Sequence, residues 1–363
     1  MTMKLSTLAA VLGALAGLLL FTPCLAPAGQ VPSTSEYRAL APIRHGNLTV
    51  FPVVAPTTHD TRGFLTLDEG LRSGEVVVTE SGSVQPLVRR RHVPITHDGA
   101  QVNQLVLVNN SKRALILLAG EIVTGGKQDR VIGKDRIIPP ESDPIDLSVF
   151  CVEPGRWTGA SAKFDGNAMN GTPMAQPALR GKAMGAKDQA QVWAEVGKTK
   201  NSLSEMVSGA AGPLQETSSY ARVMENKDVK QQVDSVAEPI QHSYHSLIQQ
   251  LRDQNAVGVV AAVNGQIVWA DIFASTSLLE KYWPKLVRSY AAEAVVTRTK
   301  GYEVDTKSAQ RFLDNLEGRH ETVEREPGLY RHTEITGDGF RAFELMSLLP
   351  KTGFDVHLAK MVE

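Results

Sequence analysis

The hydrophobic pattern changes once along the chain, and that change limits the possible folds more than any other feature of the sequence. Before about residue 157 the apolar residues form short runs rich in β-branched side chains, such as 48–54 and 75–80, which predict strands. From about residue 188 they recur at helical spacing, as in 188–207 and 228–253. Strands followed by helices, a hairpin, further helices and further strands predict an α+β fold.

The β-rich region is expected to span residues 46–157. Its strands are short and separated by Gly, Asn and Pro, which predicts an antiparallel sandwich or an open barrel. Two of these strands, 104–108 and 114–118, flank Asn109 and Asn110. Because Asn tolerates a positive φ, this pair predicts a tight hairpin.

Residues 188–363 are expected to form an α+β region that packs on the first, so that both belong to one composite domain. Its clearest hairpin surrounds Asn264 and Gly265, because this dipeptide between two apolar runs is a strong hairpin signal. Pro239 indicates a kink or a helix start within 228–253. The other predicted elements are helices at 275–297 and 306–317 and strands near 320–326, 329–335 and 339–345.

Two segments outside these regions lack a regular pattern. Residues 158–187 are rich in Gly, Ala and Met and show no apolar periodicity. An irregular stretch of this length is usually a functional loop or a linker, so we expect a long loop here. Residues 29–45 are rich in Pro and Ser and predict a short tether.

The first 28 residues have the pattern of a secretory signal peptide. Lys4 precedes an apolar run over 5–21, and Ala26 and Ala28 supply the small residues that a cleavage site requires. We expect cleavage after Ala28 and export to the periplasm or the medium. No stable membrane span is expected after cleavage.

Two alternatives to cleavage remain at the N-terminus. The apolar run is marginally long enough to serve as a retained membrane anchor, although its small-residue exit favours cleavage. Lipidation of Cys24 would need Leu three positions earlier and a small residue just before it, where the chain has Phe21 and Pro23.

Charge and cysteine content narrow the class of protein further. The chain has 38 Lys and Arg against 39 Asp and Glu, a net charge of −1, so nothing attracts it strongly to nucleic acid. Once the signal is removed, Cys151 is the one remaining cysteine. It lies in an apolar run over 147–152 and is expected to be a buried, unreactive core thiol.

A polar turn within 119–136 is the strongest candidate for a site. Apolar residues lead into Gly125, Gly126, Lys127, Gln128, Asp129 and Arg130. Paired glycines allow close approach of the backbone, and cations beside free N–H groups suit a phosphate or carboxylate. Glu121 and Asp129 are the candidate general acid–base groups. The alternative is a hairpin with a solvated charged turn. A nucleotide-binding P-loop is excluded, because Gln128 replaces the required Ser or Thr.

Further candidates lie outside this turn. Glu153, Arg156 and Trp157 close the last apolar run of the β-rich region, where Arg can clamp an anion or stack on a ring. Asp271 follows the hairpin and is a possible site carboxylate. The remaining polar groups are Lys285, Arg288 and Glu293 on one predicted helix, which fit either a shared face or surface pairing, and His242 and His245, which have metal-ligand spacing but no third ligand. We therefore predict no metal site.

Several long motifs resemble the family called ARPP-1, the ADP-ribosylglycohydrolase and rhodanese-phosphatase-superfamily-associated protein domain. The similar segments are 118–133, 149–153, 155–157, 271–273, 283–286 and 288–290. The resemblance covers roughly residues 45 to 300. It implies no particular reaction or cofactor, but the family name suggests a link to ADP-ribose or nucleotide derivatives.

The leading hypothesis is an exported protein with one composite pocket for a small anionic ligand. Gly125–Arg130, Glu153, Arg156, Trp157 and Asp271 would line it, and Lys127, Arg130 and Arg156 would hold the anion. Whether the protein is an enzyme stays open. The alternative is a non-catalytic envelope protein that binds another protein through its Met-rich loop at 158–187.

Overall fold

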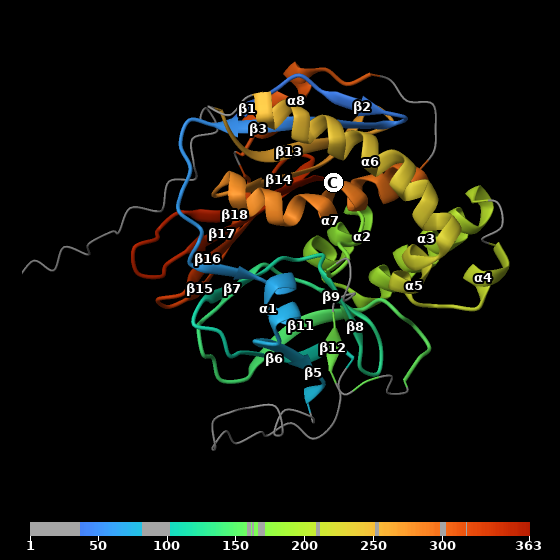
Figure 1. Ribbon diagram of the computed structural model, residues 1–363, viewed down its shortest axis with the longest axis horizontal. Helices are drawn as coiled ribbons and strands as arrows, with labels where there is room; N and C mark the ends of the chain where they lie inside the picture. Colours follow the sequence, from blue (N-terminus) through green and yellow to red (C-terminus); the bar gives the residue numbers. More distant parts are fainter. Residues whose placement is uncertain are drawn as a thin grey trace, which may run out of the picture. The chain divides into compact units, whose positions relative to one another are not determined.

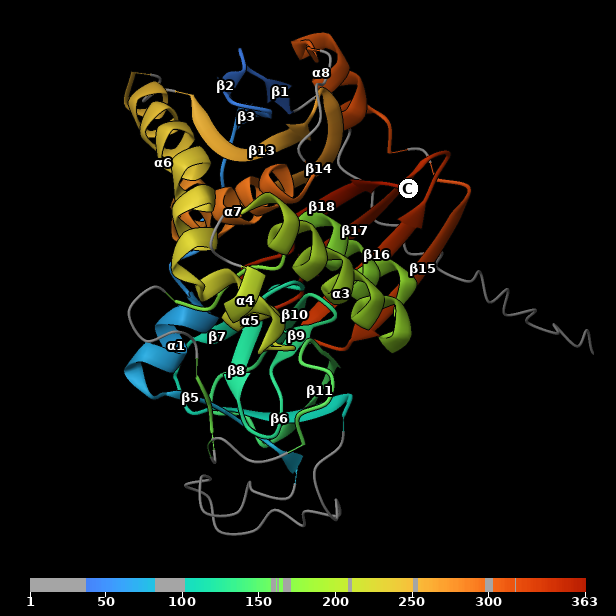
Figure 2. The ribbon, with the colours of Figure 1, turned by 90° about the vertical axis from the view of Figure 1, so that its right-hand side faces the viewer.

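The computed structural model describes residues 37–81, 102–157, 161, 163–165, 171–207, 211–250, 254–297, 303–316 and 318–363. The predicted signal peptide, its cleavage site and Cys24 lie outside these residues, as do residues 29–36 of the predicted tether. The remainder of that segment is not a tether, because Arg38–Ala39 and Ile43–His45 are strands that pair with Leu48–Ala55. Everything that follows concerns the described part of the chain, whose strands and helices are shown in Figures 1 and 2.

A nine-stranded antiparallel sheet draws strands from both ends of the sequence. Its order is β1-β3-β13-β14-β18-β17-β16-β15, with β2 paired to β3. The strands are β1 (Arg38–Ala39), β2 (Ile43–His45), β3 (Leu48–Ala55), β13 (Asn255–Val263), β14 (Gln266–Phe273), β15 (His320–Glu326), β16 (Tyr330–Thr336), β17 (Phe340–Ser347) and β18 (Asp355–Val362). Because β3 pairs with β13, the two regions distinguished in the sequence share one sheet.

A six-stranded closed barrel forms the second β layer. It consists of β5 (Val76–Thr79), β6 (Gln104–Asn109), β8 (Ile122–Gly125), β9 (Arg130–Ile132), β11 (Ile145–Cys151) and β12 (Phe164–Asp165). A small sheet beside it contains β4 (Phe64–Thr66), β7 (Ala114–Leu117) and β10 (Arg136–Ile138). The predicted α+β class is confirmed, and the barrel is closed rather than open. Cys151 is fully buried as expected, and burial raises the pKa of its thiol.

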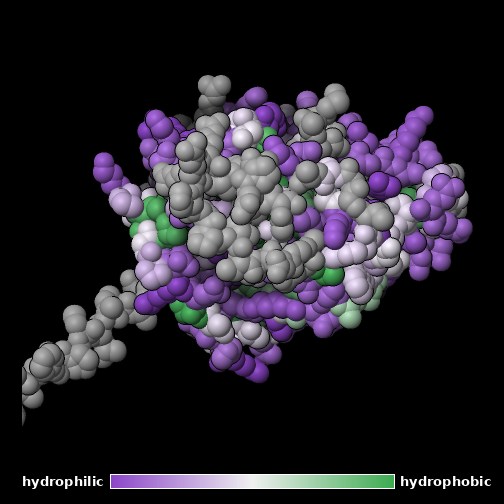
Figure 3. All heavy atoms as spheres, turned by 90° about the horizontal axis from the view of Figure 1, so that it is seen from below, coloured by the Kyte–Doolittle hydropathy of each residue, from purple (hydrophilic) through white to green (hydrophobic). Residues whose placement is uncertain are grey.

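The helices lie mainly in the second half of the chain. They are α1 (Leu67–Ser73), α2 (Pro177–Gly181), the π-helix η4 (Lys182–Ala186), α3 (Gln189–Met206), α4 (Ala211–Gln215), α5 (Tyr220–Glu225), α6 (Lys227–Gln250), α7 (Thr276–Val296) and α8 (Thr306–Asp314). Pro239 lies within α6, which continues through it. Among the described residues, no helix has both the length and the apolar character to cross a bilayer. Among the residues that are not grey in Figure 3, most are hydrophilic, and the apolar ones lie in small separate spots.

Helix α7 lies between the large sheet and the barrel (Figures 1 and 2) and is buried along most of its length. Ser275 caps its first turn by accepting from the Leu278 N–H. Apolar residues cover most of its surface, but Lys285, Ser289 and Glu293, spaced four apart, form a buried polar stripe. This stripe faces the segment 172–178, and its three members bind that segment at different points.

The predicted hairpin at Asn109 is wrong, because the strands on either side of it enter different sheets. β6 pairs with β5 and β11, whereas β7 pairs with β4 and β10. Asn109 is buried, and its Nδ2 donates to the Arg113 and Pro139 carbonyls. Its Oδ1 accepts from the Ser111 N–H. The side chain thus closes the turn itself, which is the other use of Asn in turns.

The long loop predicted at 158–187 is also partly wrong, because residues 177–186 are helical. Pro177 occupies the first turn of α2, where its missing N–H costs nothing. Leu179 and Arg180 are fully buried. Tertiary contacts stabilise these two short helices, which hold too few turns to show periodicity in the sequence.

Candidate functional site

The turn between β7 and β8, residues 118–121, lies between two buried groups of charged side chains. Gly120 has φ +95°, and a Cβ there would stand 2.6 Å from the Arg180 side chain, so this position favours glycine. The Glu121 carboxylate accepts from the Leu118 N–H at 2.9 Å. The turn therefore fixes Glu121, predicted as a candidate acid–base group, in a fully buried position.

The first group surrounds the amine of Lys285 and is called the lysine cluster. Lys285 Nζ lies 2.8 Å from Glu121 Oε1, 2.7 Å from Thr172 Oγ1 and 2.5 Å from Asp68 Oδ2. Thr172 also donates through its N–H and hydroxyl to Asp68. Asp68 stands in the first turn of α1, whose start is fixed by a capping box between Thr66 and Glu69.

One cation and two carboxylates share the lysine cluster, and both burial and these charges shift their pKa values. Burial raises the pKa of Glu121, and the attraction of Lys285 offsets only part of that increase. Burial also opposes ionisation of Asp68, but Lys285 and Thr172 outweigh it and lower the Asp68 pKa. Burial would lower the pKa of Lys285, yet its two carboxylate neighbours raise it. Of the two carboxyls, Glu121 is therefore the one more disposed to hold a proton.

A cavity of about 300 Å³ opens beside the lysine cluster, between α5, α6, α7 and the segment that starts at Gly171. Its apolar lining comes from Pro173, Met174, Met224, Val233, Pro284 and Ala292. Lys285 and Arg288, one turn apart on α7, also line it. A small apolar enclosure with a few converging polar groups is the usual form of a ligand site.

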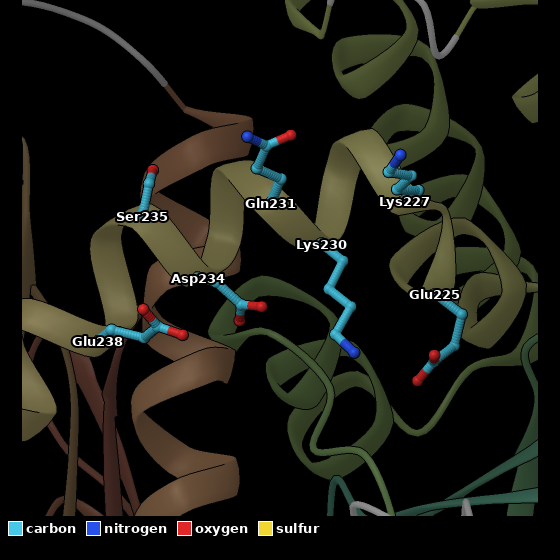
Figure 4. Close-up of a pocket in the computed structure, with 7 residues that line it drawn as sticks. All are labelled: Glu225, Lys227, Lys230, Gln231, Asp234, Ser235 and Glu238. Atoms are coloured by element: carbon cyan, nitrogen blue, oxygen red, sulfur yellow. The ribbon is translucent and has the colours of Figure 1, made fainter.

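Arg288 connects the cavity to the outer face of α6. Its guanidinium lies 2.6 Å from Asp234, and its side chain is 43% exposed. Asp234 also lines a wide, shallow hollow of about 810 Å³ along α6, and Glu225 lines both the hollow and the cavity. In Figure 4 the side chains of Glu225, Lys230 and Asp234 point to the same side of this helical surface.

The second buried group contains Arg180, Asp271, His357, Asp135 and Tyr290, all fully buried, and is called the arginine cluster. Arg180 binds Asp271 through two contacts of 2.9 Å, and Tyr290 also donates to Asp271. The two ring nitrogens of His357 lie 2.6 Å from Asp135 and 3.1 Å from Asp271. Asp135 accepts from the Ala119 N–H at 2.6 Å.

The arginine cluster balances two cations against two carboxylates. Burial would lower the pKa of His357, but Asp135 and Asp271 outweigh it and raise that pKa to about 9. Arg180 and His357 in turn lower the pKa of Asp271 against the effect of burial. The charges of this cluster are paired, and none of its side chains is exposed. Asp135 binds the Ala119 N–H and Arg180 lies against Gly120, so the cluster holds the turn at 119–120 in place. Asp271, predicted as a pocket carboxylate, belongs to this cluster.

The polar turn predicted as a ligand loop joins β8 to β9 as a hairpin. Its three successive N–H groups already have acceptors within the protein. Gly125 donates to Asp129 at 3.0 Å, Gly126 to Ser161 at 3.2 Å and Lys127 to Glu80 at 2.8 Å. The backbone nest that suits an anion is thus occupied by the protein's own oxygens.

The candidate residues at 153–157 pack on this hairpin, so the structure brings them together with the candidate residues at 125–130. Glu153 accepts from the Asp129 N–H at 3.0 Å and from Arg156 at 2.5 Å. Arg156 also donates to the Gly125 and Gly126 carbonyls. Trp157 is 43% exposed, with the Lys127 amine 4.9 Å from its ring centroid.

The other side chains of the hairpin are buried rather than solvated. Gln128 donates to the Glu153 carbonyl, and Arg130 donates to the carbonyls of Val102 and Gln128. Burial raises the pKa of Asp129, whose carboxylate accepts from the Ser219 hydroxyl at 2.6 Å. The solvated charged turn, considered as the alternative from the sequence, is not what the structure contains.

The predicted residues therefore divide among three places instead of lining one pocket. Glu121 joins Lys285 beside the cavity, Asp271 joins the arginine cluster, and the turn at 125–130 binds Glu153, Arg156 and their neighbours. Sequence reasoning missed Asp68 and Thr172 in the lysine cluster and Asp135, Arg180 and His357 in the arginine cluster. Asp68 is an ordinary first-turn acid of α1, and nothing in the sequence marked the other four as members of a charged cluster. Among the described residues, no three His, Cys, Asp or Glu side chains are arranged to hold a metal ion.

Comparison with known proteins identifies the family. The sequence model of the ARPP-1 family, the ARG and Rhodanese-Phosphatase-superfamily-associated Protein domain, matches residues 36–361. The chain belongs to this family. The match confirms the resemblance and extends it through the C-terminal strands, beyond the range of 45 to 300 covered by the motifs. No curated protein and no solved structure matches the chain.

Proposed function

We propose that this ARPP-1 protein binds a small organic anion in the cavity beside the lysine cluster, with Arg288 as its charged anchor. The observation that carries the proposal is the cavity itself, where the partly exposed Arg288 of α7 stands beside a wall of apolar side chains. Arg288 pairs with Asp234 at the surface, so an incoming carboxylate or phosphate has a partly exposed guanidinium to bind.

The size and lining of the cavity favour a compact ligand with an apolar body. A volume of about 300 Å³ is at the lower end of the range for small-molecule sites. Met174 and Met224 line the cavity, and Met side chains adapt to irregular apolar shapes. We therefore favour a short carboxylate or phosphate ester over a ligand as large as ADP-ribose.

The predicted location and the predicted ligand loop are part of the same proposal. The pattern of residues 1–28 supports export, so the ligand would be met in the periplasm or outside the cell. A role for the turn at 125–130 in binding the anion rests on the amine of Lys127 and on the exposed face of Trp157 beside it. Lys127→Ala tests that role separately from the cavity.

Thermal-shift titrations with a panel of short carboxylates, phosphate esters and ADP-ribose would test the proposal. A ligand at about 100 times its Kd adds about 2.7 kcal/mol to stability. We expect a short anion to bind, and Arg288→Gln to weaken it by about tenfold or more. Lys281→Gln is the matched control, since it removes another exposed, ion-paired cation from α7 that does not line the cavity.

A filling variant separates the cavity from the surface around it. Ala292 is buried and lines the cavity, so Ala292→Leu should place methyl groups in that space and abolish binding while the protein stays folded. Binding that survives both Ala292→Leu and Arg288→Gln would move the site elsewhere. If Lys127→Ala alone removed it, the site would be the turn at 125–130.

Catalysis is the second candidate, favoured by the raised pKa of Glu121. Thr172 and Lys285 line the cavity and both contact Glu121, so a proton held on Glu121 is one hydrogen bond away from a bound ligand. General acid–base catalysis uses such carboxyls. Ligand turnover that falls with Glu121→Gln, while ligand binding is retained, would support this role. Unchanged turnover would exclude it.

A further inference from the structure

Strand β15 forms one edge of the nine-stranded sheet. It pairs with β16 on one side, and the strand order ends with it on the other. All seven residues, His320–Glu326, are exposed, and Figure 2 shows the strand at the rim of the sheet. An edge of this kind presents backbone donors and acceptors that another strand can pair with.

The charges on β15 are arranged so that the strand complements itself. Its sequence is His-Glu-Thr-Val-Glu-Arg-Glu. We propose that two copies of this chain join their β15 strands antiparallel about a two-fold axis at Val323, which would continue the sheet from one copy into the other. Glu321 of each copy then lies opposite Arg325 of the other, and the two Val323 side chains meet at the axis.

The other positions fit the same register. His320 falls opposite Glu326, and Thr322 opposite Glu324, so each carboxylate faces a group that can donate a hydrogen bond. The 46% exposed side chain of Val323 becomes covered by its own copy. Opposite charges and apolar pairs across neighbouring strands each stabilise a sheet, whereas directly opposed like charges destabilise it.

Neighbouring registers lack this complementarity. A shift of one residue in either direction places Glu321 opposite Glu324 or opposite Glu326. A shift that centres the pair on Glu324 sets two carboxylates against each other. The charges that commonly protect an edge from unspecific pairing thus exclude these registers while they favour the one centred on Val323.

The sheet within one copy leaves a charge that the partner would neutralise. Arg325 lies opposite Arg331 of β16, and Arg331 has its own partner, Glu344, at 3.4 Å. Among the described residues, Glu321 and Arg325 form no ion pair. A partner's Glu321 would therefore supply the carboxylate that Arg325 lacks.

Charge-reversal variants test the register directly. Glu321→Arg should weaken self-association by about tenfold or more, because both Glu–Arg pairs become Arg–Arg pairs. Arg325→Glu should do the same with Glu–Glu pairs. An equimolar mixture of these two variants should associate again, since every pair between unlike copies is then Arg with Glu. Lys307→Glu on α8, an exposed charge reversal away from β15, is the matched control.

Sedimentation velocity over a range of protein concentrations measures these effects, and circular dichroism checks that each variant is folded. A single strand pair is a small interface, so we expect a wild-type dimer that dissociates on dilution and weakens at high salt. A wild type that stays monomeric at the highest soluble concentration would overturn the proposal. So would a mixture of the two variants that associates no better than either alone.

Discussion

Replacing Lys285 with methionine would remove the cation of the lysine cluster while it keeps a flexible side chain with an apolar stem. The wild-type amine contacts Glu121, Thr172 and Asp68 at 2.5 to 2.8 Å. Glu121 is fully buried, and the Asp68 side chain is 15% exposed. Lys285→Met leaves both carboxylates without their cation, and only Asp68 retains some contact with water.

Removing one partner of a buried ion pair costs about 3–5 kcal/mol. We expect Lys285→Met to lower the free energy of unfolding by an amount in that range at pH 7. The loss should shrink as the pH falls, because the folded-state pKa of Glu121 is already raised by burial and rises further without Lys285. A carboxyl of this kind favours the folded state most below its unfolded pKa, and this advantage is lost as pH rises through its folded pKa.

The double variant Lys285→Met with Glu121→Gln distinguishes a lost charge pair from a lost packing contact. Glutamine is neutral and can still accept from the Leu118 N–H, so we expect it to recover about 2 kcal/mol of the single-variant loss. Urea denaturation at pH 7 and pH 5, followed by circular dichroism, measures the free energy of unfolding of the wild type, the two single variants and the double variant. A loss below about 1 kcal/mol for Lys285→Met, or a double variant less stable than Lys285→Met alone, would refute this reasoning.

Three further variants address the other clusters. The stability that protonated His357 confers is fully present below its ordinary pKa of 6.5 and is lost as pH rises through about 9. The free energy of unfolding, measured by urea titration, should therefore fall by about 3 kcal/mol over that range. His357→Gln should flatten this pH profile. Gly120→Ala should cost at least about 2 kcal/mol, because the new Cβ meets Arg180 at a positive φ; a melting temperature equal to wild type would contradict this. Arg156→Met should destabilise the barrel by about 1–3 kcal/mol, because Glu153 and two carbonyls lose their donor, and a denaturation midpoint unchanged from wild type would count against that role.

Local sequence patterns correctly predicted the elements that a few neighbouring residues specify. Asn264 has φ +52° and Gly265 φ +77° in the hairpin between β13 and β14, as the dipeptide predicts. Ser275 begins α7 and Cys151 is buried. By contrast, Asn109 can close a turn with its side chain as well as with its backbone, and only the pairing of the neighbouring strands decides between these uses.

The composition of the site was harder to predict, because its partners are distant in sequence. Glu121 and Lys285 are 164 positions apart, and Arg180 and Asp271 are 91 apart. Spacing rules compare neighbours along one element, so they cannot identify such pairs. Spacing rules also cannot tell whether backbone N–H groups are free to bind an anion or already donate to the protein. The Lys127 N–H, for example, donates to Glu80.

The polar stripe of α7 affects how substitutions in this chain should be interpreted. Lys285 holds Thr172, Ser289 donates to the Ala175 carbonyl, and Glu293 accepts from the Ala178 N–H. One helix thus keeps a cavity wall and the start of α2 in register. A survey that scores protein abundance would therefore classify Lys285 as a folding residue and overlook its place in the cavity. Arg288, whose side chain is 43% exposed, would be expected to stand out only in a survey that scores ligand binding.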